Sequence, residues 1–354
     1  MKNRRAFLKT VAAAGATAMV PAAGLIAQTT RGRAGLAAGA LLMQQRGAPP
    51  GARSRTGRID VHHHRITGAN EVRGQAWSPA IALEQMDRYG ISTAITSVSA
   101  GANQLYDGTQ KSNSFARQTN EHGAKMVQDY PGRFGLFVAL PMGDIAASLK
   151  EIEFGYDTLR ADGVHFYSSI NDKWPGDPTY APLYEELNRR KSIVFIHPTN
   201  PTCCKTPPGI GGPVVEFDFD MTRAATSLLW NGVLTRFKDI KFIIVHSGGT
   251  LPVLAGRIQD RVPRNRADLY PTGALELLKN LYYEVAHATF PWAMAALMKF
   301  TSTSHIMFGT DYPQEPIEST TKYIPDLGLS AEVLRAIDRG NAEVLFPRIV
   351  GVGN

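Results

Sequence analysis

The sequence predicts a barrel of eight parallel strands alternating with helices, the (βα)8 or TIM-barrel fold of the α/β class. From Arg58 onward, short apolar runs rich in β-branched residues alternate with longer stretches of helical periodicity, and eight such runs are visible. Runs such as Ile243-Ile244-Val245 are wholly apolar, as expected for strands covered by helices on one face and by a packed interior on the other. Eight parallel strands would make a large open sheet, so a closed barrel is favoured.

The elements are expected in the following order. The strands are residues 58–62, 92–97, 134–139, 163–167, 192–196, 241–245, 281–286 and 304–308. Helical periodicity is expected between them over residues 80–89, 112–129, 181–190, 219–237 and 291–300. Residues 198–216 are rich in Pro and Gly, so we expect a long loop after the fifth strand, of the kind that shapes an active-site mouth.

The basic charge of the chain is confined to its N-terminal segment. The formal charge of the whole chain is +7, but residues 1–57 hold nine of the 38 Lys and Arg residues and no Asp or Glu. The remaining 29 basic and 31 acidic residues give a net charge of −2. We therefore expect a leader over residues 1–57 and one catalytic barrel over residues 58–354, whose charge indicates no nucleic-acid partner.

The leader has the order of features found in an export signal. Paired Arg4 and Arg5 precede Phe7, Leu8 and a short run of Ala and Gly. This order resembles a twin-arginine signal and predicts a periplasmic or exported protein, with a disordered basic tail as the alternative. The apolar run is too short and too rich in Ala for a stable membrane span, and no later segment is apolar enough for one.

Side chains able to bind a metal follow four of the eight expected strands. The first strand leads into His62, His63 and His64, the fifth into His197, the sixth into His246 and the eighth into Asp311. Active-site groups of such barrels lie at the carboxyl ends of the strands, where these residues are expected to meet. Alternation along the first strand places His62 and His64 on one side and His63 on the other.

We therefore expect His62, His64, His197 and Asp311 to bind one divalent ion, with His246 beside it. A single buried histidine is more often a satisfied core residue, but four separate strands would have to place such residues at one rim by chance. Three imidazoles and one carboxylate suit Zn²⁺, with Mn²⁺ as the alternative. An exported metal-binding protein without catalysis is a further alternative, although it would not need a long loop above the ion.

The order of these motifs resembles the amidohydrolase superfamily, in the branch that contains aminocarboxymuconate semialdehyde decarboxylase. The motifs are Asp-x-His-x-His (60–64), HP (197–198), HSGG (246–249) and GTDYP (309–313), and the resemblance extends over WSPAIALEQMDRYGI (77–91), YPGRFGLFVALPM (130–142) and GNAEVLF (340–346). It covers nearly all of residues 58–346. GDPTYAPLYEELNRR (176–190) and HPTNPTCC (197–204) are most similar to bacterial proteins of the 6-methylsalicylate decarboxylase type.

The resemblance implies roles for individual residues. His62, His64, His197 and Asp311 match the metal ligands, and His246 matches a histidine that hydrogen-bonds the water on the metal or the substrate. Arg257 matches an arginine that reaches a substrate carboxylate in dimers of this family, in its own or the neighbouring subunit, so a homodimer is expected. Simple solvent exposure of Arg257 is the alternative.

The chain also departs from the family pattern. Its fourth strand, GVHFY (163–167), lacks the Lys that bridges two ions in binuclear relatives, which favours one ion. The segment before Trp77 is short, so a second carboxylate-binding arginine has only Arg73 as a candidate, and Thr199 stands where the semialdehyde decarboxylases have an aromatic residue. Both departures argue against the semialdehyde as substrate.

The implied activity is metal-dependent nonoxidative decarboxylation of a small aromatic or unsaturated carboxylic acid, such as a hydroxybenzoate. This carboxy-lyase reaction needs a proton at the carbon that loses CO₂, and Asp311 or His246 is expected to supply it. Metal-dependent hydrolysis of a lactone, ester or amide is the alternative, since it uses the same ion and the same proton-transfer groups.

Several neighbouring residues leave two roles open. His165, inside the fourth strand, is expected either to bind substrate or to pack in the core. His287, after the seventh strand, is expected at the pocket rim, with contact to Asp311 as the alternative, and Asp60 either orients a ligand histidine or caps backbone donors. The adjacent Cys203 and Cys204 do not suit a disulfide framework, and they either line the pocket or have a structural role.

Overall fold

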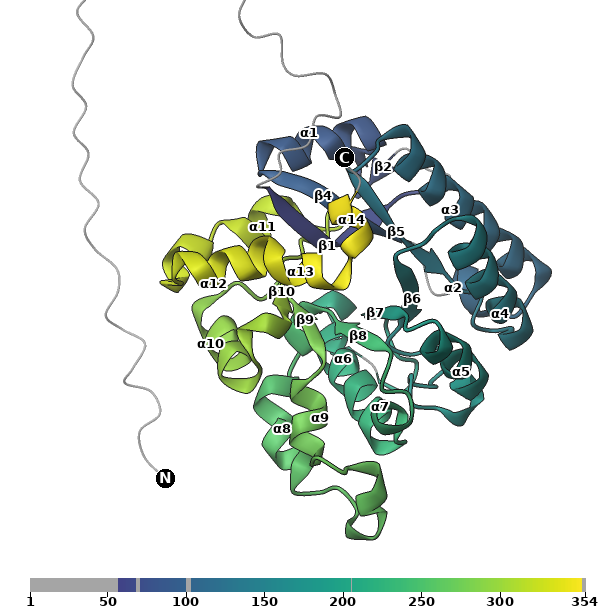
Figure 1. The fold of residues 1–354 in the computed structure, drawn as a ribbon, viewed down its shortest axis with the longest axis vertical. Helices are drawn as coiled ribbons and strands as arrows, with labels where there is room; N and C mark the ends of the chain where they lie inside the picture. Colours follow the sequence, from purple (N-terminus) through teal and green to yellow (C-terminus); the bar gives the residue numbers. More distant parts are fainter. Residues whose placement is uncertain (1–56, 68–70, 100–102, 205, 352–354) are drawn as a thin grey trace, which may run out of the picture. The chain divides into compact units, whose positions relative to one another are not determined.

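Eight parallel strands form the centre of the structure, a computed structural model that describes residues 57–67, 71–99, 103–204 and 206–351 (Figure 1). The sheet order is β1-β4-β5-β6-β7-β8-β9-β10, with neighbouring strands parallel. The strands are β1 (Arg58–Arg65), β4 (Ile91–Val98), β5 (Phe134–Ala139), β6 (Gly163–Tyr167), β7 (Ile193–His197), β8 (Lys241–Ile244), β9 (Tyr282–Glu284) and β10 (Ile306–Met307). The predicted barrel is confirmed, and each expected strand is present.

Helices surround these strands (Figure 1). They are α1 (Pro79–Arg88), α2 (Asn103–Tyr106), α3 (Gln110–Asp129), α4 (Ile145–Glu153), α5 (Ala181–Arg189), α6 (Gly212–Trp230), α7 (Val233–Arg236), α8 (Leu251–Gln259), α9 (Ala274–Lys279), α10 (Pro291–Phe300), α11 (Ile317–Thr321), α12 (Ala331–Arg335), α13 (Asn341–Leu345) and α14 (Pro347–Gly351). A hairpin of β2 (Glu71–Val72) and β3 (Gln75–Ala76) precedes α1. Among the described residues, none of the helices combines the length and apolar character needed to cross a membrane.

Helix α6 begins earlier than the sequence predicts. The loop expected through residue 216 ends at residue 211, and Gly212 opens the helix with Pro213 in its first turn. Proline is tolerated there because the first backbone N–H groups of a helix have no partner within it. The first turn of α6 therefore adds helical residues to the wall that a loop alone was expected to form.

The barrel closes between β1 and the segment that follows β10. The backbone N–H of Val61 donates to the carbonyl of Phe308 at 3.0 Å, and that of His64 donates to the carbonyl of Tyr312 at 2.7 Å. These hydrogen bonds bring the histidines of β1 beside Asp311. Closure of the barrel thus assembles residues from opposite ends of the domain.

Arg65, directly after the histidines, joins β1 to its neighbours from inside the structure. Its guanidinium donates to the carbonyls of Thr96 at 2.7 Å, Thr119 at 3.1 Å and Phe137 at 3.2 Å. Burial lowers the pKa of this fully buried side chain to about 9. Three carbonyls from β4, α3 and β5 thus satisfy a charge that would otherwise be expensive to bury.

Candidate metal centre

Three imidazoles and one carboxylate converge at the carboxyl ends of the strands. The Nε2 atoms of His62 and His64 are 3.3 Å apart, and those of His64 and His197 are 3.2 Å apart. Asp311 Oδ1 lies 3.2 Å, 2.8 Å and 3.8 Å from the Nε2 atoms of His62, His64 and His197. These distances bracket the value of about 3.4 Å expected between ligand atoms placed about 2.1 Å from a tetrahedral ion.

The outer ring nitrogen of each histidine has a partner away from this centre. The contacts are His62 Nδ1 with Glu284 Oε1 at 2.9 Å, His64 Nδ1 with Ser97 Oγ at 2.8 Å, and His197 Nδ1 with the Pro198 carbonyl at 2.9 Å. When Nδ1–H donates outward, Nε2 presents its lone pair inward. The three imidazoles are therefore oriented as metal ligands.

Asp311 completes this donor set. Its buried Oδ1 has no hydrogen-bond partner within the described residues, although imidazoles surround it. A buried carboxylate oxygen without a partner is costly, and a cation would satisfy it. Burial alone would raise the pKa of the Asp311 carboxyl, but positive His62 and the hydrogen bond with His287 hold it well below its ordinary value. The donor set fits a divalent ion.

The two ligand histidines of β1, His62 and His64, differ in charge when no ion is bound. Burial disfavours a charged His62, but the carboxylates of Glu284 and Asp311 outweigh it and raise the pKa of this imidazole to about 10. Burial lowers the pKa of His64 to about 3. An ion that binds at neutral pH must therefore displace a proton from His62, because the metal ligand is the neutral imidazole.

His63 points away from the metal centre, as alternation predicts, and its partner is Asp60. His63 Nδ1 is 2.9 Å from Asp60 Oδ2, and its ring lies beside that of Tyr312. Asp60 also accepts hydrogen bonds from the backbone N–H groups of His62 and Thr310, at 3.0 Å and 3.1 Å. Asp60 therefore caps backbone donors, and the imidazole ring that it contacts is that of His63 rather than that of a ligand.

Glu284 in β9 is a residue of the centre that the sequence motifs do not mark. Its fully buried carboxylate meets His62 Nδ1 through Oε1 and accepts from the backbone N–H groups of His246 at 2.6 Å and Ala286 at 2.7 Å. Burial opposes its ionisation, yet His62 and these hydrogen bonds lower the pKa of Glu284 overall. The sequence feature that could have indicated a role for Glu284 is its position as the one carboxylate within the otherwise apolar strand LYYEVA (281–286).

His246 and His287 flank the second oxygen of Asp311. Oδ2 lies 2.9 Å from His287 Nε2 and 3.7 Å from His246 Nε2. Burial lowers the pKa of His246 to about 4, whereas Asp311 outweighs burial and raises the pKa of His287. The prediction that His287 is a rim residue is therefore incomplete: its side chain is 35% exposed, but it also pairs with Asp311 because β9 and β10 are adjacent.

A cavity of about 640 Å³ adjoins the metal centre. His64, His197 and Asp311 form part of its wall, and the loop after β7 and the first turns of α6 contribute Asn200 and Phe217. The volume lies within the range of about 300–1,000 Å³ typical of small-molecule sites. The segment after the fifth strand thus shapes the mouth of the site, as predicted.

Arg73 and His165, two residues predicted to contact the substrate, lie differently with respect to this cavity. Arg73 lines the cavity, and its Nη1 lies 3.1 Å from Glu315 Oε1. His165 is buried, with ring centroids 4.5 Å from Tyr167 and 5.9 Å from His197, and it is not among the cavity-lining residues. The structure thus places His165 in the packed interior beside the ligand His197, and neither of its ring nitrogens has a hydrogen-bond partner among the described residues.

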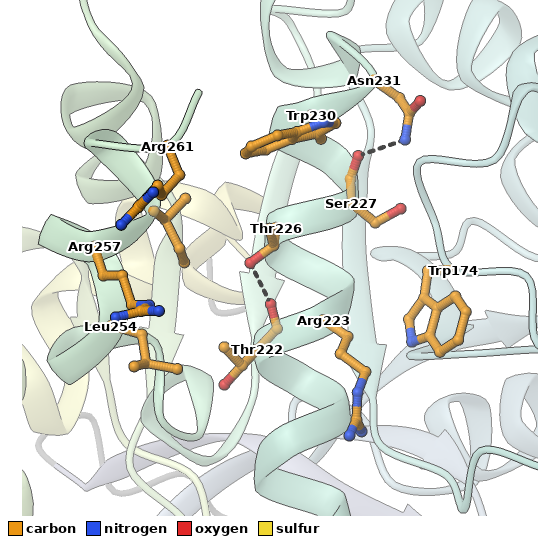
Figure 2. Close-up of a pocket in the computed structure, with 11 residues that line it drawn as sticks. Trp174, Thr222, Arg223, Thr226, Ser227, Trp230, Asn231, Leu254, Arg257 and Arg261 are labelled. Atoms are coloured by element: carbon orange, nitrogen blue, oxygen red, sulfur yellow. Dashed lines mark hydrogen bonds between the residues drawn. The ribbon is translucent and has the colours of Figure 1, made fainter. Parts of the chain in front are cut away.

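Arg257 lies apart from the metal centre. It lines a second cavity of about 620 Å³ between α6 and α8, with Arg223, Arg261 and Trp230 (Figure 2). It does not line the cavity that adjoins Asp311. Within one chain, the structure therefore does not bring Arg257 to the site where a substrate contact was expected.

The adjacent cysteines are free thiols. Neither of them is among the residues that line the cavity at the metal centre. The backbone N–H of Cys203 donates to Asp172 Oδ1 at 3.0 Å, which attaches this loop to the segment after β6. The structural alternative expected for Cys203 and Cys204 agrees with this placement.

A parallel (βα)8 barrel with three imidazoles and one carboxylate at its carboxyl end defines a metal-dependent barrel enzyme. The chain belongs to the amidohydrolase family, whose profile matches residues 59–348.

Named relatives within this family are similar over most of the chain. Decarboxylase yanB of Aspergillus niger is 34% identical over 322 residues, covering 82% of this chain and 88% of the relative. The 6-methylsalicylic acid decarboxylase of Penicillium expansum is 30% identical over 316 residues, covering 83% and 98%. A solved dihydroxybenzoic acid decarboxylase from Polaromonas sp., with bound manganese and 2-nitroresorcinol, has the same fold, with a TM-score of 0.71, 24% identity, and coverage of 82% and 97%.

Proposed function

We propose that this chain is a metal-dependent nonoxidative decarboxylase of a small aromatic carboxylic acid of the hydroxybenzoate type. The observation that carries the proposal is the convergence of four metal ligands at the wall of a cavity of about 640 Å³. The relatives named as decarboxylases, including one that acts on 6-methylsalicylic acid, favour this lyase reaction over hydrolysis.

The proposed cofactor is one divalent ion held by His62, His64, His197 and Asp311. Three imidazoles and one carboxylate favour Zn²⁺, and the manganese in the Polaromonas structure supports Mn²⁺ as the alternative. When bound, the ion would hold the substrate carboxylate and a neighbouring oxygen and stabilise charge that develops on oxygen.

The cavity wall supplies surfaces that suit an aromatic ring. Tyr167 and Phe217 line the cavity, and the Phe217 ring centroid is 6.5 Å from that of His197. Aromatic side chains pack favourably against a planar ring, and Thr199 and Asn200 add polar groups for its substituents. We infer that these residues orient the ring with its carboxylate toward the ligands.

A proton must replace the carboxylate on the ring. As the carbon–carbon bond breaks, CO₂ leaves and the bonding electron pair stays on the ring carbon. We propose that Asp311 Oδ2 or His246 Nε2 delivers the proton to that carbon. His287 Nε2, 2.9 Å from Oδ2, would then return a proton to Asp311.

The test is release of CO₂ from a panel of acids by metal-loaded protein. Salicylate, 6-methylsalicylate and 2,6-dihydroxybenzoate are incubated with the enzyme, and turnover of at least one is expected. His246→Gln should keep the ion and lower turnover by about 10²–10⁴-fold, the usual contribution of a proton-transfer group.

The matched control is His305→Gln, which removes a histidine in the segment before β10 and should leave turnover unchanged. Full metal occupancy without CO₂ from any member of the panel would contradict the proposal. Cleavage of an aryl ester or lactone by the same preparation would favour hydrolysis.

We also propose that residues 1–57 are a twin-arginine export signal followed by a basic linker. The paired Arg4 and Arg5 support this, and residues 1–56 lie outside the described part of the chain. Replacing both arginines by lysine should retain the protein in the cytoplasm, as measured by cell fractionation. Unchanged export of the double variant would contradict the signal.

We further propose a homodimer in which Arg257 reaches the substrate carboxylate of the partner subunit. Arg257 is exposed on α8, and its planar guanidinium suits a carboxylate. Arg257→Ala should raise KM more than it lowers kcat. A monomer by light scattering, or an unchanged KM, would contradict this arrangement.

A further inference from the structure

A second group of metal-binding atoms lies next to the first. Asp311 Oδ2 faces His287 Nε2 at 2.9 Å and His246 Nε2 at 3.7 Å, and the ligand atoms of the three residues lie within 4.8 Å of one another. The two distances bracket the value of about 3.4 Å expected around a tetrahedral ion. Neither imidazole belongs to the four-residue set that contains Asp311 Oδ1.

His246 Nε2 is a buried atom that no other described residue satisfies. The atom is buried and has no hydrogen-bond partner among the described residues. The His246 side chain is only 6% exposed, and its other ring nitrogen lies toward Asp218 Oδ1, at 3.9 Å. A buried polar atom without a partner is costly unless a ligand satisfies it.

Asp311 has one oxygen for each group. Oδ1 faces His62 and His64, whereas Oδ2 faces His246 and His287. In two-metal sites, a bridging ligand of this kind holds ions about 3.5–4 Å apart. Asp311 can therefore act as the bridge, which removes the need for the lysine that the fourth strand lacks.

The second group is open to ions from the cavity. His246, His287 and Asp311 all line its wall, together with the carboxylates of Asp218 and Glu315. An ion could therefore keep water molecules on its free side, as ions with few protein ligands do. Glu315 is paired with Arg73, so the carboxylate of Asp218 is the nearby charge that favours a cation at this position.

The backbone at the three ligands is also unusual. His246, His287 and Asp311 have φ values of 52°, 60° and 60°, in the left-handed region that non-glycine residues rarely adopt. Such conformations persist where the surrounding structure imposes them, and they are concentrated at functional sites. Three successive strand ends thus share this conformation where the second group of ligands meets.

We propose that His246, His287 and Asp311 Oδ2 bind a second divalent ion of the Zn²⁺ type, and that its binding inhibits the enzyme. The inhibition rests on the proposed function, in which His246 and Asp311 transfer the proton. A nitrogen or oxygen lone pair that is donated to an ion cannot accept and deliver that proton. The first ion therefore activates the enzyme and the second inhibits it.

The first experiment counts zinc ions without any substrate. Metal-free full-length protein is titrated with Zn²⁺ by calorimetry, and the bound metal is measured by mass spectrometry at saturation. Wild type and the control His305→Gln should bind two ions per chain, the second more weakly, whereas His287→Gln should lose the weaker one. One ion in saturated wild type, or two in His287→Gln, would overturn the site.

The location of the second ion can be checked in crystals of the zinc-saturated wild type. An anomalous zinc peak between His246, His287 and Asp311 is expected beside the peak at His62, His64 and His197. A single peak at the latter site would show that the His287–Asp311 contact is only a hydrogen bond that orients Asp311, and would overturn the proposal.

The second experiment follows CO₂ release as zinc is added. Wild-type activity should rise to one equivalent and then fall as the second ion binds. His287→Gln should be slower throughout, because it lacks the group that returns the proton to Asp311, but its remaining activity should not fall beyond one equivalent. A second ion that binds without lowering activity would overturn the inhibitory role. If no acid is turned over, the metal count still decides whether the site exists, so the two failures are distinguishable.

Discussion

Replacing Glu284 by Gln tests whether this buried carboxylate holds the metal centre in place. Its Oε1 meets His62 Nδ1 at 2.9 Å and accepts the N–H of His246, and its Oε2 accepts the N–H of Ala286. Gln has nearly the same shape but offers one oxygen and one NH₂ group. With the oxygen at the Oε1 position, two contacts persist and the NH₂ group faces the N–H of Ala286.

The cost can be worked out from these contacts. One buried N–H loses its acceptor, which lowers the free energy of unfolding by about 1–3 kcal/mol. Loss of the negative charge behind His62 weakens the lone pair that Nε2 offers the ion, and changes of this kind lower metal affinity by about 10–100-fold. The opposite amide orientation would leave two donors without an acceptor, so it is less stable.

Metal affinity is measured by competition with a chromogenic zinc chelator, and stability by urea unfolding of the metal-free protein. The control is Glu276→Gln, which removes the same charge from a half-exposed residue paired with Lys279 on α9. The control should change neither quantity appreciably. A Glu284→Gln variant with wild-type zinc affinity would refute the argument that Glu284 supports His62.

Three further predictions concern other parts of the barrel. His63→Ala should keep the ion but lower the free energy of unfolding by about 1–3 kcal/mol, because the buried carboxylate of Asp60 loses a partner. His64→Ala should lose the ion. Equal loss of metal in the two variants, measured by elemental analysis, would contradict the alternation. Gly309→Ala should lower both melting temperature and zinc affinity, because its Cβ would overlap Glu284 Oε2, and unchanged values would contradict that packing. Hydrogen bonds from two neighbouring arginines lower the pKa of Glu186 to about 2, so its contribution of about 0.5–1 kcal/mol is present above the ordinary pKa and lost as pH falls toward 2. Glu186→Gln should therefore lower the urea midpoint at pH 7 and less so at pH 4, and an equal loss at both pH values would contradict the ion pair.

Much of the fold and part of the site could be predicted because their signals are local in the sequence. Alternating apolar runs and helical periodicity mark the strands and helices wherever they lie in space. In this fold class the carboxyl ends of the strands lie at one rim of the barrel, so the four ligands could be grouped without coordinates: His62, His64, His197 and Asp311. Alternation within β1 separated His63 from its two neighbours for the same local reason.

Other features depended on which distant residues become neighbours. Glu284 meets His62 across 222 residues of chain, and no spacing motif encodes that contact. Strands β9 and β10 are neighbours in the sheet, so His287, which follows β9, lies beside Asp311, which follows β10. Hydrogen bonds to β1 hold the segment that carries Asp311 in place. The packing of α6 and α8 likewise placed Arg257 in a separate cavity.

The sequence by itself therefore determined the elements of the barrel and the residue types at their ends, because periodicity and strand alternation are properties of short segments. Only the tertiary structure decided which oxygen of Asp311 faces which imidazole, and thus that a second group of ligands exists. The physical reason is that side-chain partners at the rim are set by barrel closure and by backbone dihedral angles at the strand ends. Neither the closure of the barrel nor these dihedral angles can be read from the order of residues along a strand.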